Sequence, residues 1–137
     1  MGRVIRFWAL AAVISLVASE ASAWENIKHQ SVSKTVLTGE KTQLGTNWHI
    51  NPDCSFADLP ATHIIEAPKH GRLQILHSKI FPNAKGLFAK CRTVRVNGLV
   101  AYYRSKPGYV GTDQVILRAP YGDGKVAETV INITVVK

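Results

Sequence analysis

The residues best suited to binding a ligand are the cations of one long segment. Between positions 67 and 112 the chain has no aspartate or glutamate, and the 137-residue chain as a whole carries a formal charge of +8. Such an asymmetry favours anionic partners. The candidate site for an anionic partner consists of six cations of this segment: Arg72, Lys79, Lys85, Lys90, Arg92 and Arg95. The alternative is that these side chains are simply the solvated faces of alternating strands.

This charge leads to two hypotheses about function. The first is a non-catalytic binding or envelope-structural module, whose partner is an anionic envelope polysaccharide, lipid headgroups or an acidic protein. Nucleic acid is not expected, because residues 1–23 have the pattern of an export signal, with Arg3 and Arg6 before an apolar run at 7–18. The second hypothesis is a small secreted enzyme or inhibitor that acts through the segment 78–90, which reads as a long loop and mixes apolar residues with lysines.

Residue types used in catalysis and metal binding occur without the required spacing. The five histidines include no i, i+2 pair that would place two ligands on one face of a strand. No serine lies in a G-x-S-x-G elbow, and the acidic residues show no recognisable pairing. We therefore predict a protein that is not an enzyme and that holds no metal or cofactor.

The first 23 residues have the three parts of a cleavable signal peptide. Arg3 and Arg6 precede an apolar run at 7–18, and Ala21-Ser22-Ala23 supplies small residues for a peptidase. The run is shorter than the roughly 20 residues of a finished membrane helix. We expect a mature chain that begins at Trp24, lies in the periplasm or outside the cell and has no membrane span. An uncleaved anchor is the alternative.

The two cysteines, Cys54 and Cys91, both lie in the expected mature chain. In an oxidising compartment such a pair is most simply a disulfide. Closing a loop of this length would stabilise the fold by about 4 kcal/mol. Two buried free thiols are the alternative.

Short apolar runs alternate with turn residues throughout 24–137, which predicts a single all-β domain of about seven or eight strands in a two-layer sandwich. The clearest strand is 127–135, where apolar residues occupy every second position. Asn97-Gly98 and Asp123-Gly124 are typical of hairpin turns. The expected strands are 31–37, 42–50, 62–67, 72–77, 92–96, 99–104, 113–119 and 127–135.

Two motifs resemble those of bacterial immunoglobulin-like and cadherin-like domains. The first is the APKHGRL sequence at 67–73, and the second is YRSKPGYVGTD at 103–113. The resemblance implies an immunoglobulin-like two-layer sandwich, here as a single copy in a small secreted protein that follows a signal peptide. Because the D-x-N-D-N linker of those domains is absent, calcium is not expected. The residues that the motifs assign to structural turns are Pro68, Gly71, Pro107, Gly108, Tyr109, Gly111 and Asp113.

Overall fold

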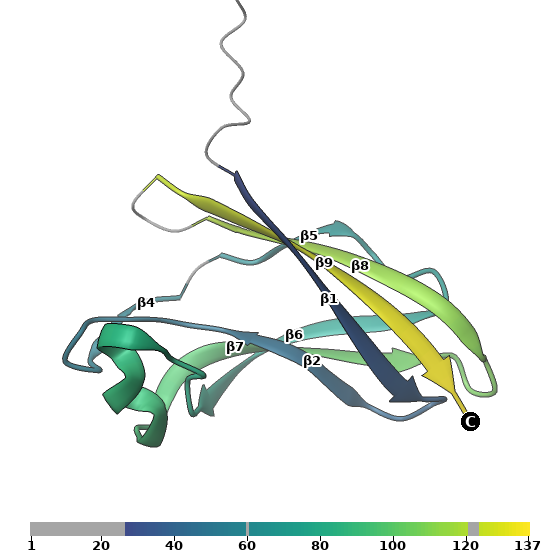
Figure 1. Ribbon diagram of the computed structural model, residues 1–137. Coiled ribbons are helices and arrows are strands. Elements are labelled where there is room, and N and C mark those ends of the chain that lie inside the picture. Colours follow the sequence, from purple (N-terminus) through teal and green to yellow (C-terminus); the bar gives the residue numbers. More distant parts are fainter. Residues whose placement is uncertain (1–26, 60, 121–123) are drawn as a thin grey trace, which may run out of the picture.

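The computed structural model describes residues 27–59, 61–120 and 124–137 (Figure 1). The expected signal peptide and the expected start at Trp24 lie outside these residues, as does Asp123 of the predicted Asp123-Gly124 turn. The described residues form nine strands and one short 3-10 helix. Their bounds are β1 Ile27–Leu37, β2 Thr42–Asn47, β3 His49–Ile50, β4 Phe56–Asp58, β5 His63–Glu66, β6 Gly71–Ile80, η1 Gly86–Thr93, β7 Val96–Ser105, β8 Gly111–Pro120 and β9 Val126–Val136.

The strands form two larger sheets and one small one. The four-stranded sheet has the order β1-β9-β8-β5, the three-stranded sheet has the order β2-β7-β6, and β3 pairs with β4. In Figure 1 the two larger sheets lie one above the other. Only the β1–β9 pair is parallel among the strand pairs of the described chain. The prediction of a mostly β chain is therefore confirmed.

The main core lies between the two larger sheets. On β9, Ile131, Ile133 and Val135 are buried, whereas Asn132 and Thr134 between them are exposed. This alternation is the one predicted from the sequence, and it turns one face of the sheet toward the core. The cluster is completed by inward side chains of four further strands: Val36, Leu44, Ala101, Tyr103 and Val115.

A second, smaller core lies at one end of the molecule. Ile50, Cys91 and Val96 are its buried members, and Ile80 and Phe88 pack against them. The predicted disulfide between Cys54 and Cys91 is present, with an S–S distance of 2.08 Å. The bond attaches η1 to the loop between β3 and β4. We call this region, formed by β3, β4, η1 and the disulfide, the disulfide end.

Several local predictions are wrong. The expected strand 92–96 does not form, because Arg92 and Thr93 belong to η1 and β7 begins only at Val96. The expected strand 42–50 is divided into β2 and β3. Asn97 and Gly98 lie inside β7 and do not form a hairpin turn. A Cβ on Gly98 would lie 2.6 Å from the Ile80 side chain, so this glycine permits close packing between strands. The segment 78–90 is not one long loop, because β6 continues to Ile80 and η1 begins at Gly86.

The predicted turn segments carry the chain between the sheets. Pro68 lies between β5 of the four-stranded sheet and β6 of the three-stranded sheet, and Pro107 lies between β7 and β8 in the same way. Both connections lie at the end of the molecule opposite η1 (Figure 1). Among the described residues, no helix has the length and apolar character needed to cross a bilayer.

Candidate anion-binding surface

A buried carboxylate joins the two connections between the sheets. Asp113 Oδ1 accepts hydrogen bonds from the backbone N–H groups of Lys69 (2.9 Å) and Gln114 (3.0 Å). Its Oδ2 accepts from the His70 N–H (2.9 Å) and from the hydroxyl of Tyr103 (2.8 Å), which is fully buried. We call Asp113 with these four partners the Asp113 corner. It fixes the start of β6 against the end of β7.

The four donors determine the charge state of the corner. Burial alone raises the pKa of the Asp113 carboxyl, but the hydrogen bonds from Lys69, His70, Tyr103 and Gln114 together hold it below its usual value. Burial, reinforced by the hydrogen bond to this carboxylate, raises the pKa of the Tyr103 hydroxyl. The corner therefore holds an ionised aspartate beside a neutral tyrosine.

Glycines and an aromatic pair complete the corner. A Cβ on Gly71 would lie 2.5 Å from the carbonyl oxygen of Arg104, so only glycine fits there. Gly108 has a φ of 81° and Gly111 a φ of 145°, values that side chains disfavour. The Tyr109 ring stacks on His70 with centroids 4.2 Å apart, and its hydroxyl donates to the Thr112 carbonyl (2.6 Å). The two sequence motifs thus meet in space.

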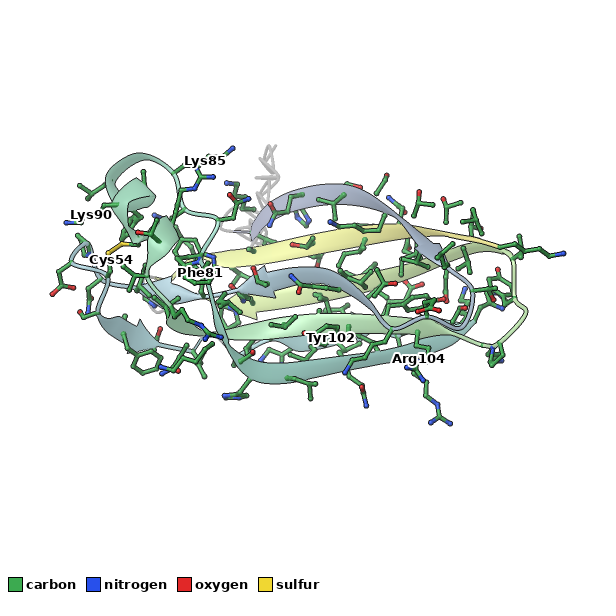
Figure 2. The ribbon with its side chains drawn as sticks, turned by 90° about the horizontal axis from the view of Figure 1, so that it is seen from below. Cys54, Phe81, Lys85, Lys90, Tyr102 and Arg104 are labelled. Atoms are coloured by element: carbon green, nitrogen blue, oxygen red, sulfur yellow. A yellow bond between two sulfur atoms is a disulfide. The ribbon has the colours of Figure 1, made fainter. Side chains whose placement is uncertain are left out.

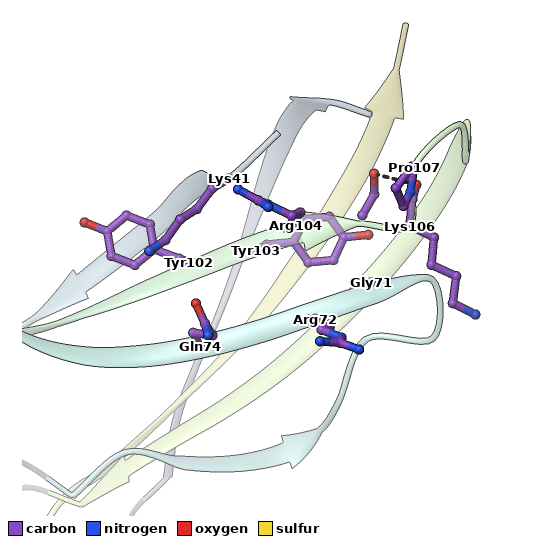
Figure 3. Close-up of a pocket in the computed structure, with 10 residues that line it drawn as sticks. Lys41, Gly71, Arg72, Gln74, Tyr102, Tyr103, Arg104, Lys106 and Pro107 are labelled. Carbon is purple, nitrogen blue, oxygen red and sulfur yellow. Dashed lines mark hydrogen bonds between the residues drawn. The ribbon is translucent and has the colours of Figure 1, made fainter. Parts of the chain in front are cut away.

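The strand ends held by the corner carry a cationic groove on the three-stranded sheet. Arg72 lies directly opposite Arg104 across β6 and β7, and Gln74 lies opposite Tyr102. Lys41 Nζ lies 4.3 Å from the centroid of the Tyr102 ring. These residues line a depression of about 570 Å³. Figure 3 shows their side chains as sticks. We call this depression the basic groove and define it by Lys41, Arg72, Gln74, Tyr102, Arg104 and Lys106.

The positive charge of the groove is not neutralised within the described chain. No aspartate or glutamate of that part lines the groove, and none of its ion pairs includes a groove cation. Several carboxylates are engaged elsewhere: Glu128 pairs with Arg118 and His29, and Asp58 pairs with His49. Like charges directly opposite on neighbouring strands are destabilising. A bound anion would therefore reduce the repulsion between Arg72 and Arg104.

The six cations proposed from the sequence do not lie together. All six are exposed, but Arg72 belongs to the basic groove, whereas Lys79 is seven residues further along β6, or roughly 23 Å in an extended strand. Lys85, Lys90 and Arg92 are on or beside η1, and Arg95 follows it. Figure 2 shows Lys85 and Lys90 beside Cys54, at the opposite end from Arg104. The structure thus divides the six predicted cations between the basic groove and the region around the disulfide end.

Sequence reasoning missed part of the groove. Strand alternation already places Arg104 and Tyr102 on one face. Lys41 is distant in sequence, and it reaches Tyr102 only because β2 pairs with β7. No local pattern in the sequence indicates that pairing.

Comparison with known proteins does not assign a family. No protein-family model and no curated protein matches this chain. Among solved structures, the solution structure of amebosin has 10% sequence identity and a TM-score of 0.43, with 80% of this chain and 98% of amebosin covered. A 2,6-sialyltransferase from Photobacterium sp. JT-ISH-224 has 10% identity and a TM-score of 0.38, with 82% of this chain but only 18% of the sialyltransferase covered. These likenesses are too weak to carry an argument about fold or function.

Proposed function

We propose that this chain is a non-catalytic binding module of the cell envelope, and that its basic groove holds an anionic polysaccharide. The observation that carries the proposal is the directly opposed pair Arg72 and Arg104. Lys41 and Lys106 add further positive charge, and no acidic residue of the described chain lines the groove. Guanidinium groups suit carboxylate, sulfate and phosphate oxygens because they donate two parallel hydrogen bonds.

The neutral members of the groove favour a polysaccharide over other polyanions. Gln74 and Tyr102 line the groove together with the cations. They match a polymer that alternates hydroxyl groups with acidic groups, since both can donate to and accept from a sugar hydroxyl. A flat bilayer fits a concave groove poorly.

We also propose an immunoglobulin-like fold of the type found in bacterial surface domains. Leaving out the short β3 and β4, the remaining seven strands can be lettered A to G along the chain. The sheets then contain B-E-D and C-F-G, which are the orders expected of such a sandwich. One departure is that the first strand, β1, joins β9 at the edge of the C-F-G sheet and not β2.

Export to the periplasm or the exterior is part of the proposal. It is supported by the three-part leader at 1–23 and by the disulfide, a bond that forms in oxidising compartments. N-terminal sequencing of protein from the cell envelope should find Trp24 first. A start at Met1 in that material would contradict cleavage.

The groove is tested by binding to polygalacturonate, with neutral dextran as the polymer control. Arg72→Glu with Arg104→Glu should weaken binding about tenfold or more, because two attractive contacts become repulsive. Lys28→Glu with Lys34→Glu makes the same charge change on β1, in the other sheet, and should have a much smaller effect. Binding should also weaken steeply with salt, since charges are screened within about 8 Å at physiological ionic strength.

If the two double variants lost polygalacturonate affinity equally, only the net charge would matter. The proposal that the groove is the binding site would then be overturned. Binding that is insensitive to salt would instead favour an apolar contact. Such a contact is the alternative hypothesis of an inhibitor or enzyme acting through residues 78–90.

A further inference from the structure

The disulfide end exposes large apolar side chains. Phe81 is 58% exposed and Leu87 is 70% exposed, the highest value among the large hydrophobic residues of the described chain. Val94 and Phe56 are exposed in the same region. Neighbouring contiguous apolar side chains in solvent often mark a surface for a partner. None of these four residues lines the basic groove.

The residues next to Phe81 and Leu87 in the chain are packed against the small core. Ile80 and Phe88 pack against the small core around Cys91, whereas their immediate neighbours Phe81 and Leu87 face solvent. The disulfide ties Cys91, within η1, to Cys54. The small core and the disulfide therefore fix the backbone on which Phe81 and Leu87 are exposed.

Cations surround the exposed apolar residues. Residues 79–95 contain no acidic residue and five exposed cations: Lys79, Lys85, Lys90, Arg92 and Arg95. The Arg95 guanidinium lies 5.8 Å from the centroid of the Phe81 ring. One carboxylate lies beside this group: Asp53, which is near enough to Lys90 to interact and accepts two hydrogen bonds from Ser55. Figure 2 shows Phe81, Lys85 and Lys90 at this end of the molecule.

We infer that residues 79–95 form a contact surface for a lipid bilayer that carries anionic headgroups. Phe81 and Leu87 enter the boundary between headgroups and acyl chains, and the five cations pair with the headgroups. Such a surface needs both an apolar element and a cluster of cations, because either alone gives weak binding. A polysaccharide or nucleic acid would satisfy the cations but would leave the aliphatic Leu87 side chain in water.

The contact surface is separate from the basic groove, which lies at the other end of the three-stranded sheet (Figure 2). Both surfaces can therefore be occupied together. The inference goes beyond the proposed polysaccharide function and does not depend on it.

The test is co-sedimentation of the mature, oxidised protein with phosphatidylcholine vesicles, with and without 30% phosphatidylglycerol. We expect binding only to the anionic vesicles. Phe81→Ser with Leu87→Ser keeps every charge and should weaken binding about tenfold or more, since two buried apolar groups are lost. Lys85→Gln with Lys90→Gln and Arg92→Gln should weaken binding to a similar extent.

The matched control is Leu37→Ser with Val110→Ser, which changes two residues that are 53% and 50% exposed near the Asp113 corner. It should leave vesicle binding within about twofold of wild type. Equal loss in this control, or equal binding to vesicles without phosphatidylglycerol, would overturn the inference. Arg72→Glu with Arg104→Glu should weaken polysaccharide binding about tenfold or more and keep vesicle binding, so the two proposals can fail separately.

Discussion

The two ends of this molecule are held together by different chemistry. At the Asp113 corner, one carboxylate accepts four hydrogen bonds from residues of three chain segments. At the disulfide end, a covalent bond and a small apolar cluster attach η1 to the loop between β3 and β4. The first end carries the basic groove and the second carries the exposed apolar residues.

This difference shows how one small β domain can brace its two ends independently. The corner lies beside the main core, where the fully buried Tyr103 offers a hydroxyl to Asp113. The disulfide end extends beyond that core and buries only a few residues of its own. Small clusters of this kind need an additional constraint, because they bury too little apolar surface to offset the entropy of ordering the chain. We therefore expect one end to respond to acid and the other to reductant.

The largest effect is expected from removing the disulfide. Cys54→Ala with Cys91→Ala should lower the free energy of unfolding by about 4 kcal/mol, because the bond closes a loop across 37 residues. Urea denaturation measures the loss. Hydrogen exchange should show early opening of η1 while the amides of Lys69 and His70 stay protected. Simultaneous loss of protection at both ends would contradict the contrast between them.

The next largest effect is expected from Asp113. Asp113→Ala should cost about 3 kcal/mol, because it leaves the buried Tyr103 hydroxyl and three backbone N–H groups without an acceptor. Asp113→Asn should cost less, since its amide oxygen still accepts. Thermal and urea unfolding give the values. A cost below 1 kcal/mol for the alanine variant would show that water replaces the carboxylate.

Acid should weaken the corner but not the disulfide. The pKa of Asp113 is depressed in the folded protein, so its contribution is complete above the unfolded value of about 3.9 and is lost as pH falls through the folded value. The loss should be smaller than for Asp113→Ala, because a protonated carboxyl can still accept hydrogen bonds. Urea titrations from pH 7 to pH 2.5 measure it. In Asp113→Asn the free energy of unfolding should fall less at low pH than in the wild type. An unchanged fall would show that other carboxyls cause it.

A smaller effect is expected from adding one methyl group beside the corner. Gly71→Ala should cost about 2 kcal/mol, because its Cβ would meet the Arg104 carbonyl at 2.5 Å and the Tyr103 ring at 2.6 Å. Gly45→Ala is the matched control, since no atom lies within 4 Å of its Cβ position. Urea midpoints of the two variants should differ clearly. Equal midpoints would mean that β6 and β7 can separate without cost.

The smallest effect on stability is expected in the basic groove. Arg104→Gln should change the free energy of unfolding by less than about 0.5 kcal/mol, and in the stabilising direction, because it removes a like charge opposite Arg72. The same variant should weaken polygalacturonate binding. Thermal melts and a binding titration on one sample give both numbers. If Arg104→Gln lowered stability but left binding unchanged, Arg104 would contribute to packing and not to binding.

Several features of this protein follow from its sequence alone. Alternation along 127–135 assigns a half-buried strand, because residues on a strand point to opposite faces in turn. The two cysteines, in a chain whose first 23 residues predict export, predict the disulfide that the structure contains. Gly108 and Gly111 occupy backbone conformations that favour glycine, so the local sequence is enough to predict their turn.

Only the tertiary structure decided which distant segments meet. Asn97-Gly98 has the chemistry of a hairpin turn, yet it lies within β7 because pairing with β6 and packing of Ile80 override the local preference. Asp113 reaches Lys69 and His70 across 44 and 43 residues. The cations of one acid-free segment are divided between two ends, and Lys41 joins Tyr102 through the β2–β7 pair. Strand pairing is non-local, whereas periodicity reports only on neighbouring residues.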